Sequence, residues 1–322
     1  MQALRVSDFA SPPQIMDTPV PAPKSGEVLV KIAACALNFA DLLMLSGKYQ
    51  ATPPLPFSPG LELSGTITAL GPDVDAADLP IGTRVAIFAG QGGLADYGCF
   101  DVNACTPLPD AMPFDEAAAF QVAFGTSHVA LAYKARLQPG ETLVVLGASG
   151  GVGLTAIEVG KLMGAKVIAV ARGADKLAVA ASKGADHLID SETADLKAEI
   201  RALGGADVIY DPVGGAQFDA AIRACNPDGR VLVIGFASGD IPKPAANILM
   251  VKNITVIGFY WGGYMTFKPN VVTDSLKQLF EWHSQGRITP HISARFPLAQ
   301  ATDALEYLRA RKSTGKVVVT ME

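Results

Sequence analysis

The fold of this chain is decided by the stretch TLVVLGASGGVG at residues 142–153. A short apolar run ends there in Gly147 and leads into a glycine-rich turn, and an apolar-periodic segment follows at residues 154–163. A second β-branched run, KVIAVA at residues 166–171, completes the pattern. Strand, glycine-rich turn, helix and strand in this order form the βαβ unit that binds a dinucleotide.

Two glycines of the turn have distinct physical tasks. Gly150 lets the backbone approach a pyrophosphate, and Gly153 lets the helix pack closely on the strand. The N–H groups at the start of the helix then face the negative charge of the pyrophosphate. Ala148 stands where the usual G-x-G-x-x-G motif has its first glycine, and its side chain is small. The turn therefore predicts a dinucleotide site at the start of this helix.

The same turn also matches the G-x-S-x-G nucleophile elbow of hydrolases, which would make Ser149 a nucleophile. That mechanism needs an acid and a histidine further along the chain. Three histidines are available there: His187, His283 and His291. However, the elbow needs a substantial sheet before it, and residues 1–120 do not read as alternating strands and helices. The sequence therefore favours cofactor binding over hydrolysis.

The segment ARGADK, residues 171–176, follows the second strand of the βαβ unit. NAD-specific folds place an Asp or Glu there, about 20 residues after the glycines, to bind the ribose 2′-hydroxyl. This chain has the cations Arg172 and Lys176 instead, which favours a 2′-phosphate and therefore NADPH. Asp175 is the competing signal, and we assign it to the first turn of the next helix, where an acid suits the helix dipole.

Length and composition limit the class of protein. The chain has 322 residues, enough for about two domains, and its 49% hydrophobic and 18% charged residues predict a large core. The net charge of −5 and the lack of a basic run argue against nucleic acid as a partner. No apolar run has the length of a membrane span, and the first residues lack a signal-peptide core. We therefore expect a cytoplasmic protein that does not bind membranes.

The potential metal ligands are scattered along the chain. The cysteines are Cys35, Cys99, Cys105 and Cys225, and the histidines are His128, His187, His283 and His291. They form no C-x-x-C pair and no cluster with the spacing of a zinc site. Reduced, mostly buried thiols and no metal are therefore expected.

Residues 1–120 have the pattern of a β-rich domain with many turns. A short helix is expected at residues 38–47, followed by the proline-rich loop PPLPFSPG at residues 53–60. Strands are expected at residues 27–34, 63–71 and 84–89. Short strands separated by Gly and Pro turns favour a small barrel.

Residues 121–258 alternate between strand and helix, which predicts a doubly wound parallel sheet. The expected strands are 142–146, 166–170, 186–189, 207–210, 229–234 and 253–258. The tail, from about residue 265, has amphipathic helices near 270–284 and 298–310. It closes with a strand at residues 316–320, which we expect to return to the first domain.

Several further stretches carry a family likeness: LNFADLL at 37–43, PLPFSPGLE at 54–62, YDPVGG at 210–215, GRVLVIGFASG at 229–239 and GFYWG at 258–262. With the glycine-rich turn, they make the chain resemble the zeta-crystallin-like quinone oxidoreductases of the medium-chain dehydrogenase/reductase superfamily over almost its whole length. The resemblance implies an α/β protein. Its GroES-like β-barrel catalytic domain spans residues 1–120 and is completed by residues 265–322, and its Rossmann NADPH-binding domain spans residues 121–264.

The same resemblance shows what is absent. The zinc alcohol dehydrogenases of this superfamily hold a catalytic Cys where Asn38 stands and a His where Leu61 stands. Neither Asn nor Leu supplies the thiolate or imidazole that zinc needs, so no metal is expected. Without a Lewis acid to stabilise an alkoxide, alcohol oxidation is disfavoured. The resemblance therefore implies hydride donation to a quinone or an α,β-unsaturated carbonyl.

The resemblance also implies roles for single residues. The pyrophosphate would lie against Ala148, Ser149, Gly150, Gly151, Val152 and Gly153. The 2′-phosphate would pair with Arg172 and Lys176, together with Arg311 from the tail. Asn38 and Thr126 would line the nicotinamide. The adenosine-ribose and carboxamide ends would be held by Gly235, Phe236, Phe259, Tyr260 and Trp261.

Tyr49 is the candidate proton donor, because related enoyl reductases have a Tyr at the matching position that donates a proton. A phenol with a pKa of about 10 in water is protonated at neutral pH and donates a hydrogen bond to a carbonyl oxygen. The alternative is a Tyr that only forms a wall of the cleft. The sequence leaves both roles open, and a quinone needs no protein acid if water protonates the product.

The sequence leaves three functions open. The first is an NADPH-dependent quinone oxidoreductase without zinc, with Asn38 and Tyr49 as its catalytic residues. The second is an NADPH-dependent enoyl or enone double-bond reductase, and the third is a non-enzymatic NADPH-binding protein. The apolar strand expected at residues 253–258 lies at the sheet edge by its order in the chain, and the resemblance implies a homodimer through it.

Overall fold

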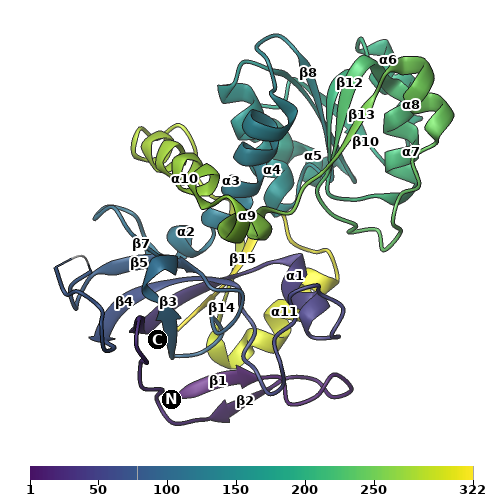
Figure 1. The fold of residues 1–322 in the computed structure, drawn as a ribbon. Coiled ribbons are helices and arrows are strands. Elements are labelled where there is room, and N and C mark those ends of the chain that lie inside the picture. The colour runs from purple at the N-terminus through teal and green to yellow at the C-terminus, as the bar shows by residue number, and fades with distance from the viewer. Residues whose placement is uncertain (78, 322) are drawn as a thin grey trace. The chain divides into compact units, whose positions relative to one another are not determined.

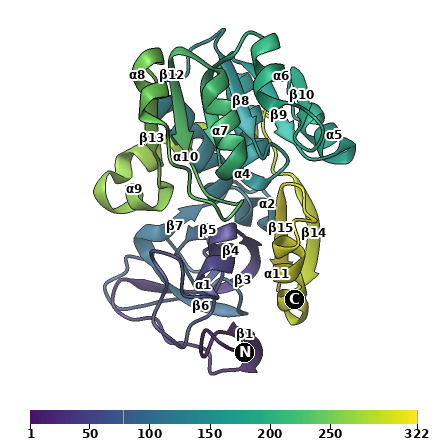
Figure 2. The same cartoon turned by 90° about the vertical axis from the view of Figure 1, so that its right-hand side faces the viewer.

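The computed structural model describes residues 1–77 and 79–321. The chain forms two compact units, drawn in Figure 1 and, turned by 90°, in Figure 2. The first unit joins residues 1–122 to residues 292–322, and the second consists of residues 123–291. Both expected kinds of unit are present, because the first is rich in β-strands and the second is built on a parallel sheet flanked by helices.

The second unit is built on a six-stranded parallel sheet. Its spatial order is β10-β9-β8-β11-β12-β13, so the direction of winding reverses between β8 and β11. This reversal defines a doubly wound sheet and places its ligand crevice at the carboxyl ends of the strands. The strands are β8 (Thr142–Leu146), β9 (Lys166–Ala171), β10 (His187–Asp190), β11 (Ala206–Asp211), β12 (Cys225–Val233) and β13 (Thr255–Gly258).

Helices cover both faces of this sheet. On one face, Leu196 of α6 and Phe218 of α7 belong to the same buried cluster as Val144 of β8. On the other, α4 approaches β8 closely, since a Cβ at Gly160 would lie 2.6 Å from Leu143 Cδ2. The helical segments are α3 (Gln121–His128), η2 (Val129–Ala135), α4 (Gly151–Leu162), α5 (Ala174–Ser182), α6 (Leu196–Ala202), α7 (Gly215–Ala224), α8 (Ala246–Lys252), α9 (Trp261–Phe267) and α10 (Pro269–Ser284).

The six strands expected from the sequence are all present, with differences at their ends. The last strand begins at Thr255 rather than at Asn253, because Asn253 has a left-handed backbone (φ +55°) and ends helix α8. Strand β12 begins at Cys225, four residues before the expected start. The helix after the glycine-rich turn begins at Gly151, so two turn glycines, Gly151 and Gly153, lie inside its first turn.

The expected return of the chain to the first domain at residue 265 is wrong, because residues up to 291 belong to the second unit. Helix α10 packs against the segment that follows α3. His128 Nδ1 lies 2.8 Å from Ser275 Oγ, and the His128 ring makes an edge contact with Trp282. The amphipathic pattern of α10 showed that one face is buried, but it did not show which domain buries it.

The first unit is built on a sheet of order β14-β15-β3-β4-β5-β7, with β6 also paired to β3. The C-terminal strand β15 pairs antiparallel with β3, which confirms that it returns to the first domain. The elements are β1 (Gln2–Arg5), β2 (Gln14–Asp17), β3 (Glu27–Leu37), α1 (Phe39–Met44), β4 (Glu62–Leu70), β5 (Arg84–Phe88), β6 (Tyr97–Asp101), η1 (Val102–Ala104), β7 (Cys105–Pro107), α2 (Phe114–Ala118), β14 (Ile292–Pro297), η3 (Leu298–Gln300), α11 (Ala301–Arg309) and β15 (Lys316–Thr320).

Gly153 and Gly150 form a matched pair for testing the close packing of α4. A Cβ at Gly153 would lie 2.3 Å from Gly147 O and 2.8 Å from Ala148 Cα, whereas a Cβ at Gly150 would meet only Gly147 O, at 3.4 Å. We expect Gly153→Ala to lower the free energy of unfolding by about 1–3 kcal/mol through overpacking. Gly150→Ala should change it by less than about 0.5 kcal/mol, measured by urea unfolding. Equal effects of the two substitutions would contradict this account.

Candidate active site

The glycine-rich turn lies at the carboxyl end of β8, at the point where the sheet reverses its winding. Gly147 has a left-handed backbone (φ +57°), and a Cβ there would lie 2.8 Å from Val213 Cγ2. Gly150 is the N-cap of α4, and a Cβ there would meet only Gly147 O, at 3.4 Å. The first N–H groups of a helix have no intrahelical acceptors, so this turn presents donors to an anion.

Several of the second-unit residues predicted from the sequence follow the carboxyl ends of neighbouring strands, whereas Thr126 lies in α3, before β8. Arg172 follows β9, Gly235 and Phe236 follow β12, and Phe259 follows β13. Because parallel strands all end at one edge of the sheet, the fold brings these residues to the edge that carries the glycine-rich turn. Phe236 and Tyr260 are exposed, whereas Phe259, Trp261 and Thr126 are buried.

Arg172 has an acidic neighbour that is distant in the sequence. Its Nε lies 3.6 Å from Glu192 Oε1, and both side chains are about half exposed. Asp190 holds this corner by accepting hydrogen bonds from the backbone N–H groups of Gly173 and Glu192. From residues 171–176 we expected no acid to pair with the cations. In the folded protein, however, Glu192 lies beside Arg172. Asp175 does lie in the first turn of α5, as predicted.

Asn38 lies in the first unit, between β3 and α1, in a buried polar network. The Lys316 ammonium donates to Asn38 Oδ1 (2.8 Å) and to Glu62 Oε1 (2.5 Å). Asn38 Nδ2 donates in turn to Glu62 Oε1 (3.0 Å) and to the carbonyl of Ala36 (3.3 Å). The second carboxylate oxygen of Glu62 accepts from the backbone N–H of Val122 (3.0 Å). Asn38 is therefore fixed by its own domain.

The register of the first sheet explains how this network forms. Val317 of β15 lies opposite Leu37 of β3, and Ala36 of β3 lies opposite Glu62 of β4. Lys316, at the start of β15, is therefore brought beside Asn38, the residue that follows β3. No local sequence pattern points to Lys316 and Glu62, because they are 254 residues apart in the chain.

Asp41 ties the start of α1 to the loop before β4. Its carboxylate accepts the backbone N–H of Asn38 (2.8 Å) and that of Gly60 (2.9 Å), and the residue is fully buried. Burial raises the pKa of Asp41 to about 6, although the two hydrogen bonds and Lys316 oppose that shift. Asp41 therefore fixes the backbone on both sides of the network.

Tyr49 follows α1 in the first unit. It is half-buried and packs against the apolar cluster of Val6, Met44, Phe57 and Leu61. Its carbonyl accepts hydrogen bonds from the backbone and side chain of Thr52. Arg311 also lies in the first unit, just after α11, with a left-handed backbone (φ +55°). Tyr49, Asn38 and Arg311 thus belong to one unit and the remaining candidates to the other.

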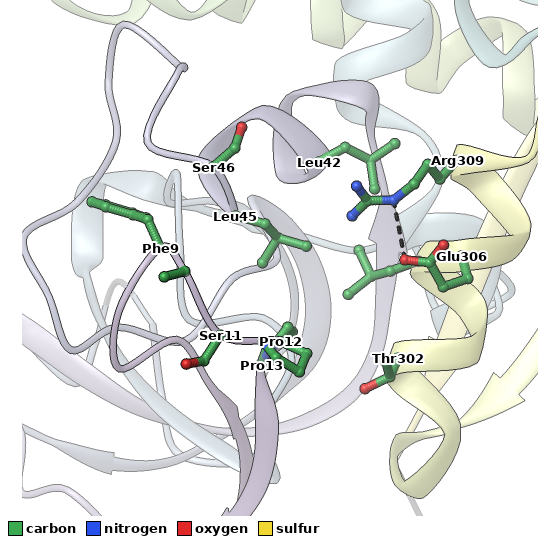
Figure 3. A pocket seen from close by; sticks show the side chains of 12 residues that line it. Phe9, Ser11, Pro12, Pro13, Leu42, Leu45, Ser46, Thr302, Glu306 and Arg309 are labelled. Atoms are coloured by element: carbon green, nitrogen blue, oxygen red, sulfur yellow. Dashed lines mark ion pairs between the residues drawn. The ribbon is translucent and has the colours of Figure 1, made fainter.

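Figure 3 shows a separate pocket of the first unit, with a volume of about 260 Å³. It is lined by Leu42 of α1, Leu45 just after that helix, Arg309 of α11 and the segment 9–13. Arg309 pairs with Glu306 at its wall (3.1 Å). None of the residues that the sequence analysis selected lines this pocket, so it is distinct from the Asn38 network.

Two structural features are absent from residues 1–77 and 79–321. No helix in that part of the chain is long and apolar enough to cross a membrane. No group of three or more His, Cys, Asp or Glu side chains there is arranged to hold a metal ion.

Comparison with known proteins identifies both domains. A family model described as an alcohol dehydrogenase GroES-like domain matches residues 24–110, and one described as a zinc-binding dehydrogenase matches residues 151–277. The chain is 38% identical over 301 residues to a quinone oxidoreductase-like protein 2 homolog of Nematostella vectensis, which covers 92% of this chain and 82% of that relative.

Two solved structures are similar over nearly the whole chain. The quinone oxidoreductase from Thermus thermophilus, solved also as its complex with NADPH, has a TM-score of 0.88 at 32% identity and covers 99% of this chain and 100% of that one. A mycobacterial structure complexed with NADPH has a TM-score of 0.92 at 29% identity, with the same coverage. The protein is therefore a medium-chain dehydrogenase/reductase with a GroES-like and a Rossmann domain. Within that class, the chain belongs to the quinone oxidoreductase-like family.

The side chains around Asn38 do not fit the zinc that one family description implies. Leu61 is buried in an apolar cluster, and Glu62 is bound to the Lys316 ammonium. Burial raises the pKa of the Cys35 thiol well above its ordinary value, and the carboxylates of Asp41 and Glu62 raise it further. The thiol is therefore disfavoured as a thiolate, and the groups around Asn38 are an amide, an apolar side chain and a carboxylate already paired with an ammonium.

The raised pKa of Asp41 has a matched control in Asp8. Both carboxylates accept two backbone N–H groups, but Asp8 is exposed and its pKa is lowered, whereas buried Asp41 has a pKa of about 6. We expect carboxyl ¹³C NMR titration to give a midpoint near pH 6 for Asp41 and a midpoint below the ordinary Asp value for Asp8.

The sign of the effect on stability follows from the direction of this shift. Because the folded pKa of Asp41 exceeds the unfolded value, its contribution to stability is full below about pH 4 and is lost as pH rises through about 6. Coinciding midpoints for Asp41 and Asp8 would show that burial does not control the Asp41 carboxyl.

Proposed function

We propose that this protein is an NADPH-dependent quinone oxidoreductase that transfers hydride without zinc. The observation that carries the proposal is the Asn38 network, in which the polar groups are bound to one another and to Lys316 rather than arranged as metal ligands. Without a Lewis acid at that place, an acceptor that is already activated, such as a quinone, is favoured over an alcohol. The quinone oxidoreductase relatives and their NADPH complexes support both the acceptor and the cofactor.

Bound NADPH would supply a hydride, and a quinone that takes this hydride together with one proton from water would become the hydroquinone, leaving NADP⁺. The turn at residues 147–153 supplies backbone N–H groups for the pyrophosphate. Arg172 and Lys176, near the start of α5, supply positive charge for the 2′-phosphate. Asn38 supplies a rigid polar surface for the nicotinamide and the acceptor, because its side chain is fixed on both sides.

A double-bond reductase is the second candidate, and Tyr49 is the observation that favours it. This side chain is half-buried beside Leu61, the residue before Glu62 of the network. An enone differs from a quinone because its reduced product needs a proton on carbon. A positioned phenol that donates to the carbonyl oxygen would assist that step. A non-enzymatic NADPH-binding protein is the third candidate. Oxidation of NADPH by the protein would exclude it, and a lack of oxidation would support it.

Cofactor preference tests the binding half of the proposal. We expect NADPH to bind more tightly than NADH, by about one to two decades if the contacts to the 2′-phosphate are worth roughly 1.5–3 kcal/mol. Arg172→Ala with Lys176→Ala should remove most of this preference in fluorescence titrations. Glu192→Gln is the matched control, since its carboxylate lies 3.6 Å from Arg172 and should repel the phosphate, so this change should strengthen NADPH binding. Equal binding of NADH by the unaltered protein would refute the assignment.

Turnover tests the catalytic half. After treatment with a chelator, the enzyme should still oxidise NADPH with a panel of quinones, and elemental analysis should find no stoichiometric zinc. Tyr49→Phe should reduce enone turnover by about 10²–10⁴-fold if Tyr49 is a general acid, and should reduce quinone turnover far less.

The pattern of rates separates the three candidate functions. Strong quinone turnover that survives Tyr49→Phe supports the quinone oxidoreductase. Negligible quinone turnover, with enone turnover that collapses in Tyr49→Phe, would make the protein a double-bond reductase. A lack of NADPH oxidation with both classes would leave only the binding protein, and one zinc per chain whose removal abolishes activity would overturn the metal-free mechanism.

A two-fold dimer through β13 is part of the proposal. β13 is the last strand in the order of the second sheet, paired on one side with β12, and the nearby Met250 and Val251 are highly exposed. An open apolar edge favours pairing with a second copy of the chain. Light scattering at micromolar concentration should give about twice the 33.5 kDa chain mass, and a monomer would contradict the dimer. The four free cysteines fit a reducing compartment and support a cytoplasmic location.

A further inference from the structure

Lys316 is the least exposed of the lysines whose side chains form ion pairs in the described residues, and it is supplied by the last strand of the chain. Its side chain is 5% exposed and that of Glu62 is 1% exposed. An ammonium removed from water in this way needs strong acceptors. It has two, Glu62 Oε1 and Asn38 Oδ1, so a single cation holds a carboxylate and an amide together.

The ammonium also determines which way the Asn38 amide faces. An amide has a donor end and an acceptor end, and a cation accepts nothing, so only Oδ1 fits against Lys316. The donor end, Nδ2, then faces Glu62 Oε1 and the Ala36 carbonyl, which are both acceptors. A flipped amide would place two donors together at Lys316 and two acceptors together at Glu62. The network therefore permits one orientation of Asn38.

This orientation has a consequence for the acceptor. Both hydrogens of Asn38 Nδ2 are directed to partners within the domain, so Asn38 has no hydrogen left to donate to a substrate oxygen. Asn38 therefore contributes a fixed shape and an oxygen that is already polarised by Lys316. This geometry therefore does not allow Asn38 to donate a hydrogen bond directly to the substrate.

We propose that Lys316 is a positioning residue, which fixes the orientation of the Asn38 amide and thereby the surface on which the nicotinamide and the acceptor are held. Glu62 acts with it as the counter-ion that keeps the ammonium in place, and Asp41 holds the backbone of Asn38 from the other side. The effect on turnover rests on the proposed function. The effect on the Asn38 amide does not, and it is measured separately.

The variants must separate positioning from folding. Lys316→Met removes the ammonium but leaves the Glu62 carboxylate buried without its cation, so this variant alone could fail to fold. Lys316→Met with Glu62→Gln removes both charges and restores neutrality. In that double variant the amide introduced at position 62 offers a donor to Asn38, so the flipped orientation becomes available. Lys166→Met is the matched control, since Lys166 also begins a strand and its Nζ donates to the Leu203 carbonyl, in the second unit.

Three measurements follow for each variant that folds. Side-chain amide ¹⁵N NMR reports the hydrogen exchange of Asn38 Nδ2, with the resonance assigned by its loss in Asn38→Asp. Titration with 2′,5′-ADP reports the adenosine end of the cofactor site, which does not involve Asn38. Steady-state NADPH oxidation with a quinone reports kcat and KM.

We expect the double variant to keep the thermal transition and the 2′,5′-ADP affinity of the unaltered protein, the latter within about twofold. Exchange of the Asn38 amide should become about tenfold faster or more, and kcat should fall by about 10–100-fold, the size expected for misplacement of a reacting group. Lys166→Met should change none of these quantities.

The outcomes distinguish the two proposals. A double variant with normal amide exchange and normal kcat would show that Lys316 only neutralises Glu62, and would overturn the positioning role. Faster amide exchange in an enzyme whose unaltered form oxidises no NADPH would support the orienting role and refute the proposed function instead. If the double variant also fails to fold, Lys316→Arg carries the test: it keeps a cation and should preserve slow amide exchange, and fast exchange there would overturn the proposal.

Discussion

The buried pairing of Lys316 with Glu62 joins parts of the first unit that are far apart in the chain. Lys316 begins the C-terminal strand, Glu62 begins β4, and Asn38 precedes α1. The second carboxylate oxygen of Glu62 also binds the N–H of Val122, the last residue of the first unit before the chain enters the second. Because neither charge is stable alone in the interior, each segment depends on the others being in place. One ion pair thus couples the C-terminal strand to the candidate catalytic surface.

The second unit depends on a different constraint, the parallel arrangement of its strands. Every strand of that sheet runs in the same direction, so the loops that follow them gather at one edge. The glycine-rich turn, Arg172 and Phe236 therefore follow strands that end at the same edge of the sheet. The close approach of α4 then depends on the missing side chain of Gly153, which allows its first turn to lie against Gly147 and Ala148. The parallel strands and the close approach of α4 together place backbone N–H groups at the edge of the sheet where we propose that the cofactor binds.

Much of this could be predicted from local patterns. The glycine-rich turn, the strands of the second sheet and the return of the last strand to the first domain were all expected, because hydrophobic period and glycine spacing are properties of contiguous residues. The placement of α10 in the second unit was not predicted, because the pattern of an amphipathic helix indicates a buried face but not the element that covers it. The approach of Glu192 to Arg172 was also not predicted, because Glu192 follows β10 whereas Arg172 follows β9.

The sequence by itself determined the fold class, the position of the glycine-rich turn and the presence of Asn38 and Leu61 where a zinc enzyme would have ligands. Only the tertiary structure decided what Asn38 is bound to. The register of β15 on β3, and of β3 on β4, brings Lys316 and Glu62 to the same amide from opposite ends of the chain. The physical reason is that strand register is set by the burial of a whole sheet, so no pattern within a few residues of Asn38 contains it.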